Sequence, residues 1–379
     1  VAGREDPREL LQPAVDAAAS GDEIWVAGGT YTRSNSDVVQ LYEEGISLYG
    51  GFTGKESIRE QRDWAANITI IDGQRTNRCI SVLTTALVDG FSIRNSAGWG
   101  MAFGTAVNCA FDENRGDFVE GGGKLGGLAI NCTFKDNAGG YSFDSGCGMS
   151  SGTAVKCVFA GNSSRLLGGG MSQGTALDCI FTGNSAADGG GMAGTAVNCV
   201  FFGNKASYGG AGVDGLAINC TLVDNSSGEW GGGLGYGKAV NCIFWGNTPD
   251  DAGTRASVTY CWMSNAAGTG SIAENPGFVN PAAGDFRLRA GSPCVNAGTP
   301  VGTPTADLLG RPRPQGAGVD MGAYEYSAGD DAAVVNPPAI LRVNTASTAA
   351  APDGLTWETA FPTLQAAANS AGYGTEIWT

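Results

Sequence analysis

The sequence repeats one short pattern seven times between Gly104 and Asn247, and this repetition restricts the fold more than any other feature. Each copy has an alternating apolar and polar run that contains a cysteine, followed five positions later by an asparagine. The cysteines are Cys109, Cys132, Cys157, Cys179, Cys199, Cys220 and Cys242, and the asparagines are Asn114, Asn137, Asn162, Asn184, Asn204, Asn225 and Asn247. Successive cysteines are 20 to 25 residues apart, which is the period of a solenoid coil.

Each copy has the periodicity of a β-strand. Val197 shares one face of its strand with Cys199, and the neighbouring Ala196 and Asn198 lie on the other face. Glycine-rich runs such as 168–171 precede the next strand and disfavour helix. A single short strand cannot bury its apolar face alone, so the copies must stack, in parallel and in register, at about 4.8 Å per coil. We therefore predict an all-β fold, a parallel β-helix.

Stacking would place the cysteines in an internal column and the asparagines in a second column at a corner of the coil. There the side-chain amides would bond the next coil or the turn backbone, and asparagine tolerates the left-handed φ of a sharp corner. In-register cysteines would keep their Cβ atoms about 4.8 Å apart, beyond the roughly 3.5–4.5 Å of a disulfide. Both series are therefore predicted to form structural ladders, with the cysteines as small buried apolar residues.

Composition excludes several classes of protein. The net charge of −15 argues against nucleic acid or an anionic membrane as a partner. The hydrophobic content of 42% argues against disorder, and the absence of any run of about 18 apolar residues predicts no membrane span. The chain has no histidine and no Cys-x-x-Cys pair, so zinc-finger and haem-attachment spacings are absent.

Changes in composition predict five segments. They are an N-terminal capping helix and first coil (1–30), the parallel β-helix (31–262), a small closing domain richer in proline and arginine (263–326), a linker (327–338) and a further cap segment (339–379). The capping helix is expected over Leu10–Ala19, where it would cover the open end of the first coil.

The last segment repeats the beginning of the chain. Aligning 364–365 with 11–12 also matches 376–378 to 23–25 without a gap. This match predicts that the tail completes the N-terminal cap of a next unit by strand addition, whether that unit is covalently joined or a second copy. Such a contact propagates as a fibre. The predicted assembly interface comprises Ile340, Leu341, Val343, Trp357, Phe361, Leu364, Ile377, Trp378, Leu11, Ile24 and Trp25.

Six coils contain Phe-x-x-Asn, and Leu222 replaces the phenylalanine in another. Together with the GGGM and GGGL runs, this pattern resembles the repeats of bacterial polymorphic outer membrane proteins. The segments at 21–32 and 46–56 look like the N-terminal coils of the same broad group of right-handed parallel β-helix surface proteins, and 275–326 is similar to a choice-of-anchor-type domain. The resemblance implies export, display on the bacterial cell surface and commonly adhesion, with no shared catalytic residues.

Parallel β-helices also include polysaccharide lyases and hydrolases. Hydrolases of the polygalacturonase kind need a histidine, and lyases need a basic residue near acidic calcium ligands. The acids of the coils are scattered over turns without a repeated position, which favours a solvated surface; they are Asp112, Glu113, Asp117, Glu120, Asp136, Asp144, Asp188 and Glu229. We therefore predict no catalytic residue, no metal site and no cofactor, with calcium at acidic corners as an alternative.

The function predicted from the sequence is that of a non-enzymatic extracellular structural protein. It would be one unit of a tandem array or head-to-tail filament whose partners are copies of itself. A monomeric surface adhesin or carbohydrate-binding protein that recognises surface glycans is the alternative, and a polysaccharide lyase or hydrolase is a third.

Overall fold

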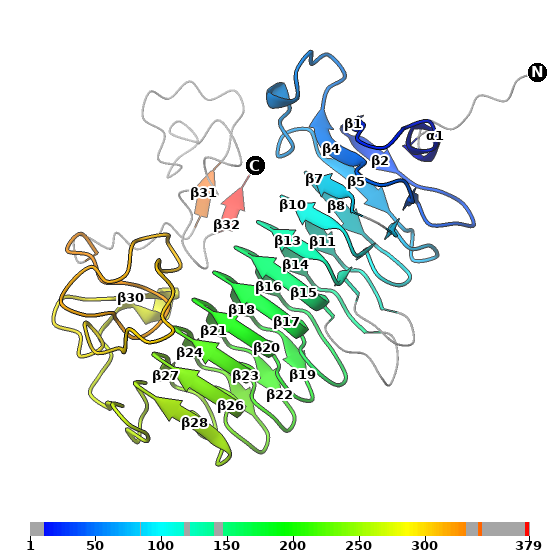
Figure 1. The fold of residues 1–379 in the computed structure, drawn as a ribbon. Coiled ribbons are helices and arrows are strands. Elements are labelled where there is room, and N and C mark those ends of the chain that lie inside the picture. The colour runs from blue at the N-terminus through cyan, green and yellow to red at the C-terminus, as the bar shows by residue number, and fades with distance from the viewer. Residues whose placement is uncertain are drawn as a thin grey trace, which may run out of the picture.

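The computed structural model describes residues 11–83, 85–116, 122–139 and 147–330, together with two backbone strands at Ile340–Arg342 and Glu376–Trp378. Within these residues the chain forms a parallel β-helix, with helix α1 (Leu11–Asp16) at its beginning and a closing domain at its end (Figure 1). The predicted all-β class and the parallel β-helix are confirmed. No helix in the described part of the chain is long and apolar enough to cross a membrane.

Two long parallel sheets form the walls of the coils. The 15-stranded sheet contains β1 (Glu23–Ala27), β3 (Val39–Leu41), β4 (Ser47–Phe52), β6 (Ile80–Val82), β7 (Leu87–Asp89), β9 (Met101–Ala102), β10 (Thr105–Val107), β12 (Lys124–Leu125), β13 (Leu128–Ile130), β15 (Met149–Val155), β17 (Met171–Leu177), β20 (Met192–Val197), β23 (Val213–Ile218), β26 (Leu234–Val240) and β28 (Ala256–Thr259). The 10-stranded sheet contains β2 (Gly29–Tyr31), β5 (Thr69–Asp72), β8 (Phe91–Arg94), β11 (Ala110–Asp112), β14 (Thr133–Lys135), β16 (Val158–Ala160), β18 (Ile180–Thr182), β21 (Val200–Phe202), β24 (Thr221–Val223) and β27 (Ile243–Trp245). A 3-stranded sheet of β19 (Ser185–Ala186), β22 (Lys205–Ala206) and β25 (Ser226–Ser227) lies in the later coils.

Pairing in register places like residues above one another inside the coils. The rings of Phe111 and Phe134 are 4.7 Å apart and nearly parallel, and Phe159 continues the stack at the same spacing. These side chains are fully buried. The odd-even alternation of each strand therefore sends one set of residues into the core and the other set to the outer face.

The asparagines form the predicted ladder. Asn137 Nδ2 donates to Asn162 Oδ1 at 2.9 Å and to the Phe111 carbonyl at 2.8 Å, and the backbone N–H of Asn137 also donates to Asn162 Oδ1. The same contacts recur along the series, so buried amides in the corner are satisfied. The cysteines stack beside them as buried free thiols, with the backbone N–H of Cys132 3.4 Å from Cys157 Sγ.

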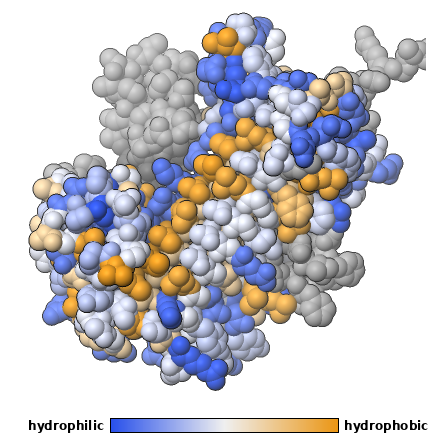
Figure 2. Space-filling model, in the orientation of Figure 1, coloured by the Kyte–Doolittle hydropathy of each residue, from blue (hydrophilic) through white to orange (hydrophobic). Residues whose placement is uncertain are grey.

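The closing domain forms a lobe beside the last coils (Figures 1 and 2). Its strands β29 (Phe278–Asn280) and β30 (Asp285–Leu288) are antiparallel. Phe278, Phe286 and Met321 pack against outward-facing residues of the 10-stranded sheet such as Val223 and Ile243. The domain therefore covers the outer face of that sheet at its C-terminal coils.

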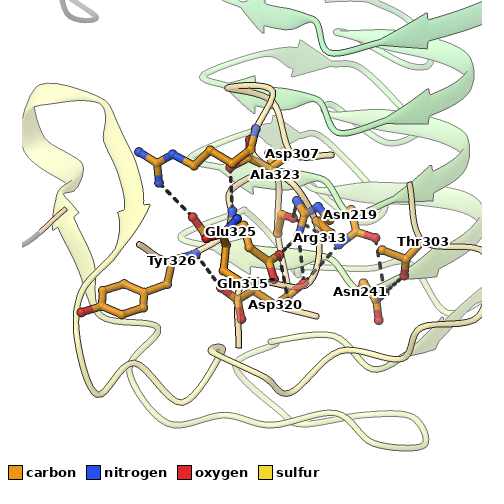
Figure 3. Close-up of polar contacts among 12 residues, drawn as sticks. Asn219, Asn241, Thr303, Asp307, Arg313, Gln315, Asp320, Ala323, Glu325 and Tyr326 are labelled. Carbon is orange, nitrogen blue, oxygen red and sulfur yellow. Dashed lines mark hydrogen bonds and ion pairs between the residues drawn. The ribbon is translucent and has the colours of Figure 1, made fainter. Parts of the chain in front are cut away.

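Polar contacts fix the same interface (Figure 3). Asn241 Nδ2 donates to the Thr299 carbonyl at 2.8 Å, and Asn219 Nδ2 donates to the Asp320 carbonyl at 3.1 Å. A buried ion pair joins Arg313 and Glu325 at 2.6 Å. These hydrogen bonds thus connect the solenoid to the closing domain.

The structure refines two predicted segments. Helix α1 ends at Asp16, three residues before the predicted end at Ala19, and Leu11 is buried against the first coils. Asp330, which the sequence places in the linker, is only 4% exposed and pairs with Arg311 at 2.6 Å. The start of the predicted linker therefore packs on the closing domain.

Candidate functional site

The outer face of the 10-stranded sheet is charged at its N-terminal coils, where the closing domain does not cover it. The register pairs Asp72 with Arg94, Arg94 with Asp112, and Asp112 with Lys135. Each follows an inward, fully buried residue such as Phe111, so its side chain lies on the outside. The four residues form a column of alternating charge, with a coil spacing of about 4.8 Å, which we call the charged column.

A second row of polar residues lies beside the charged column, at the corners that end these strands. Asn95, Glu113 and Asp136 all adopt left-handed φ values, from 51° to 53°. Later coils place Gly161 and Gly183 at the corresponding corner. A left-handed glutamate is uncommon, and such conformations cluster at functional sites.

Within the charged column, Asp72 and Arg94 form an ion pair with each other, whereas Asp112 and Lys135 have no close partner among the described residues. Arg94 Nε contacts Asp72 Oδ2 at 2.9 Å. In contrast, the Asp112 carboxylate has no hydrogen bond or ion pair with any described residue, and Lys135 Nζ has only a 3.9 Å contact with Asp136. Burial raises the pKa of Asp112, and the neighbouring Asp136 and Glu113 add to this effect while Lys135 and Arg94 oppose it. Asp112 and Lys135 therefore have no close partner among the described residues, and Arg94 uses only Nε in its pair with Asp72, which leaves its two terminal nitrogens to meet a ligand.

Two adjoining hollows lie over these strands. The first has a volume of about 550 Å³, and its lining includes Ser92, Arg94, Asp112, Glu113, Lys135 and Asp136. The second, of about 490 Å³, shares Ser92 and Asp112 with the first and extends to Trp64, Ile68, Asn108 and Asn131. Together they make a surface groove that is charged at one side and mainly apolar at the other.

The acidic residues of the groove do not converge as metal ligands do. No group of three or more His, Cys, Asp or Glu side chains in the described ranges is placed to hold a metal ion. Calcium at the acidic corners of the coils stays a prediction.

The acidic residues that the sequence analysis considered lie in different parts of the structure. Asp112, Glu113 and Asp136 line the groove, whereas Asp188 and Glu229 belong to other coils. Asp117, Glu120 and Asp144 lie outside the described residues.

Sequence reasoning overlooked Arg94 and Lys135, although a signal existed. Asp112 and Lys135 each stand three residues after a ladder cysteine, at Cys109 and Cys132. Equal offsets from the ladder put the two side chains in one outward column.

The predicted assembly residues fall into three groups. Leu11 is buried, Ile24 packs partly buried against the core, and Trp25 is 39% exposed and stacks on Phe52 with ring centroids 4.9 Å apart. Strand β31 (Ile340–Arg342) pairs in parallel with β32 (Glu376–Trp378), which brings the backbone of Leu341 opposite that of Ile377. Val343, Trp357, Phe361 and Leu364 lie outside the described residues. The interface between units stays a prediction.

Comparison with known proteins identifies the fold. No family model matches the sequence, and no curated protein matches it. The solved structure of pectate lyase Pel9A is similar with a TM-score of 0.56 and 16% identity, over 83% of this chain and 90% of that one. ORF18 of Geobacillus virus E2 aligns over 62% of this chain and 56% of its own, with 15% identity and a TM-score of 0.36.

The expectation that the chain is non-enzymatic is contradicted by this comparison, because the similar β-helix of Pel9A is that of a lyase. The expectation was wrong because the sequence was searched for an acidic position repeated in the turns, and residues of different coils were not considered together. Residues of different coils, such as Arg94, Asp112 and Lys135, come together only through the register. The resemblance to polymorphic outer membrane proteins and to an anchor domain stays a prediction.

Proposed function

We propose that the protein is an extracellular polysaccharide lyase that binds an acidic polysaccharide in the groove and cleaves it by β-elimination. The observation that carries the proposal is the charged column, in which Lys135 and Asp112 line the groove and have no close partner among the described residues. The coil spacing of about 4.8 Å is close to the advance of one sugar residue along an extended polysaccharide. The β-helix likeness to a pectate lyase supports the same class of substrate.

In the proposed reaction, Arg94 pairs with the carboxylate of a uronate residue, which makes the C5 proton of that sugar more acidic. The side-chain nitrogen of Lys135 accepts the C5 proton as the general base. The electron pair of the C5–H bond forms a C4=C5 double bond, the C4–O glycosidic bond breaks, and the departing oxygen takes a proton from water. Asp112 accepts hydrogen bonds from sugar hydroxyls and orients the ring.

The test is the ultraviolet absorbance of the unsaturated product, with polygalacturonate as substrate and dextran as a neutral control polymer. Lys135→Met should lower the rate at least about 100-fold, because general-base groups contribute on that scale. Lys238→Met is the matched control, since Lys238 is exposed on the other long sheet, in β26. Absence of unsaturated product from the native chain, or equal rates in the two variants, would contradict the proposal.

We also propose that copies associate end to end, because the pairing of β31 with β32 gives a model for the junction. Strand β32 has the sequence Glu-Ile-Trp, as do residues 23–25 of β1, and β1 has β4 as its one strand neighbour in the described part of the chain. A strand like β31 from a second copy would therefore fit the free edge of β1.

Negative-stain electron microscopy of the full chain and of residues 1–339 tests this assembly. Fibres that disappear on truncation are the expected result. Isolated rods in both samples would remove the assembly proposal and leave the lyase proposal intact.

A further inference from the structure

The second hollow differs in chemistry from the first. Trp64, Ala65 and Ile68 reach it from the loop between β4 and β5, and Ala110 lies on its floor. Ile68 is 53% exposed, although large apolar side chains favour burial. None of the described residues that line this hollow is basic, and Asp112 at the shared edge is its acidic member.

The loop that presents Trp64 is held firmly. Arg62 forms an ion pair of 2.7 Å with Asp89 and donates to the Gly50 carbonyl at 3.0 Å. The backbone N–H of Asp63 donates to the Gly51 carbonyl at 2.9 Å. These contacts anchor the residues that precede Trp64 to β4 and to the end of β7.

Trp64 also lies directly against a glycine of the sheet. A Cβ atom at Gly90, where φ is +81°, would approach Trp64 Cβ to 2.8 Å. Any larger residue at this position would push the indole away. The base of the Trp64 side chain is therefore held close to the sheet, which reduces the entropy lost on binding.

The rim of this hollow carries amides suited to sugar hydroxyls. Asn131 Nδ2 donates to Asn108 Oδ1 at 2.7 Å, and Asn108 Nδ2 donates to Asp89 Oδ1 at 3.0 Å. The Asn131 Oδ1 acceptor has no hydrogen bond with a described residue, and Asn131 is exposed. An aromatic face with a few polar groups at its edge is the usual composition of a small-molecule site.

From these features we infer that the second hollow is a neighbouring subsite that takes a sugar residue without a free carboxylate, stacked on Trp64. This inference rests on the proposed function. A uronate anion here would meet the Asp112 carboxylate and no cation among the described residues that line the hollow, and it would lose hydration against apolar side chains. A methyl-esterified uronate keeps its ring and loses its charge, and its C–H face can lie on the indole. The preferred substrate is therefore a partly esterified acidic polysaccharide.

The experiment compares kcat and KM on fully de-esterified polygalacturonate and on partly methyl-esterified pectin. The native chain should have the lower KM on the esterified polymer. Trp64→Ala should raise that KM about tenfold, the scale of an aromatic binding hot spot, with kcat nearly unchanged because Trp64 lines the second hollow, whereas Lys135 and Arg94 line the first. Trp64→Phe should restore most of the loss. Trp230→Ala, which removes a tryptophan that is 44% exposed outside the groove, should change nothing.

Failure of this inference can be told apart from failure of the proposed function. If the native chain cleaves both polymers and Trp64→Ala leaves both KM values unchanged, the subsite is wrong and the lyase stands. If the native chain cleaves neither polymer, tryptophan fluorescence with esterified pectin decides the subsite alone. Quenching that Trp64→Ala abolishes supports the subsite, and no quenching overturns it.

Discussion

A single lysine interrupts the apolar interior of the solenoid. Lys124 pairs in register with Met101 on one side and Met149 on the other, and like them it is fully buried. Among the described residues, its side-chain nitrogen donates to backbone carbonyls alone, those of Phe103 and Gly104. Burial lowers the pKa of Lys124 to about 7, because the charged form loses its hydration.

Lys124→Met should therefore stabilise the protein and change its response to pH. Between about pH 7 and the ordinary range of lysine, near about 10.4, the unfolded chain holds a proton that the folded chain lacks. The free energy of unfolding of the native chain thus rises with pH over this window. We expect the variant to gain about 4–5 kcal/mol at about pH 6 and less at about pH 9, measured by urea denaturation. A gain that is equal at both pH values would contradict the assignment.

At the scale of the coil, the asparagine ladder is the element that the sequence repeat predicted. Asn162 Nδ2 donates to the Phe134 carbonyl and to Asn184 Oδ1, each at 2.9 Å, and its Oδ1 accepts from Asn137. Asn162→Ala should cost about 2–4 kcal/mol, because it leaves buried donors and acceptors without partners. Asn265→Ala, at an exposed turn, is the control and should change stability by less than about 0.5 kcal/mol in the same denaturation experiment.

The same coils explain why the site was harder to predict than the fold. Cysteine, phenylalanine and asparagine recur at fixed offsets, so the period and the stacking of these residues could be inferred from the sequence alone. The outward column changes residue from coil to coil, from Asp112 and Lys135 to Ala160. A position occupied differently in each repeat carries no periodic signal. The contacts that bury Asn219 and Asn241 under the closing domain were hidden for the same reason, because they join segments over 50 residues apart.

At the scale of the molecule, the closing domain is the part whose docking depends on a few buried charges. The side chain of Arg313 is 1% exposed and that of Glu325 is 0% exposed. Arg313 also donates to the Gly322 carbonyl at 2.9 Å and contacts Asn198 of the solenoid. One guanidinium therefore connects the closing domain internally and ties it to a coil.

Arg313→Leu should release the closing domain before the coils unfold. The substitution leaves Glu325 buried without its partner, which destabilises by about 3–5 kcal/mol. Undocking would expose the apolar face around Val223 and Ile243. Hydrogen exchange should then show lost protection in residues 278–326 and retained protection in β5 to β16. The double variant Arg313→Leu with Glu325→Leu should recover much of the protection, because both buried charges are gone. Equal loss of protection throughout the chain would instead mean that solenoid and closing domain unfold as one unit.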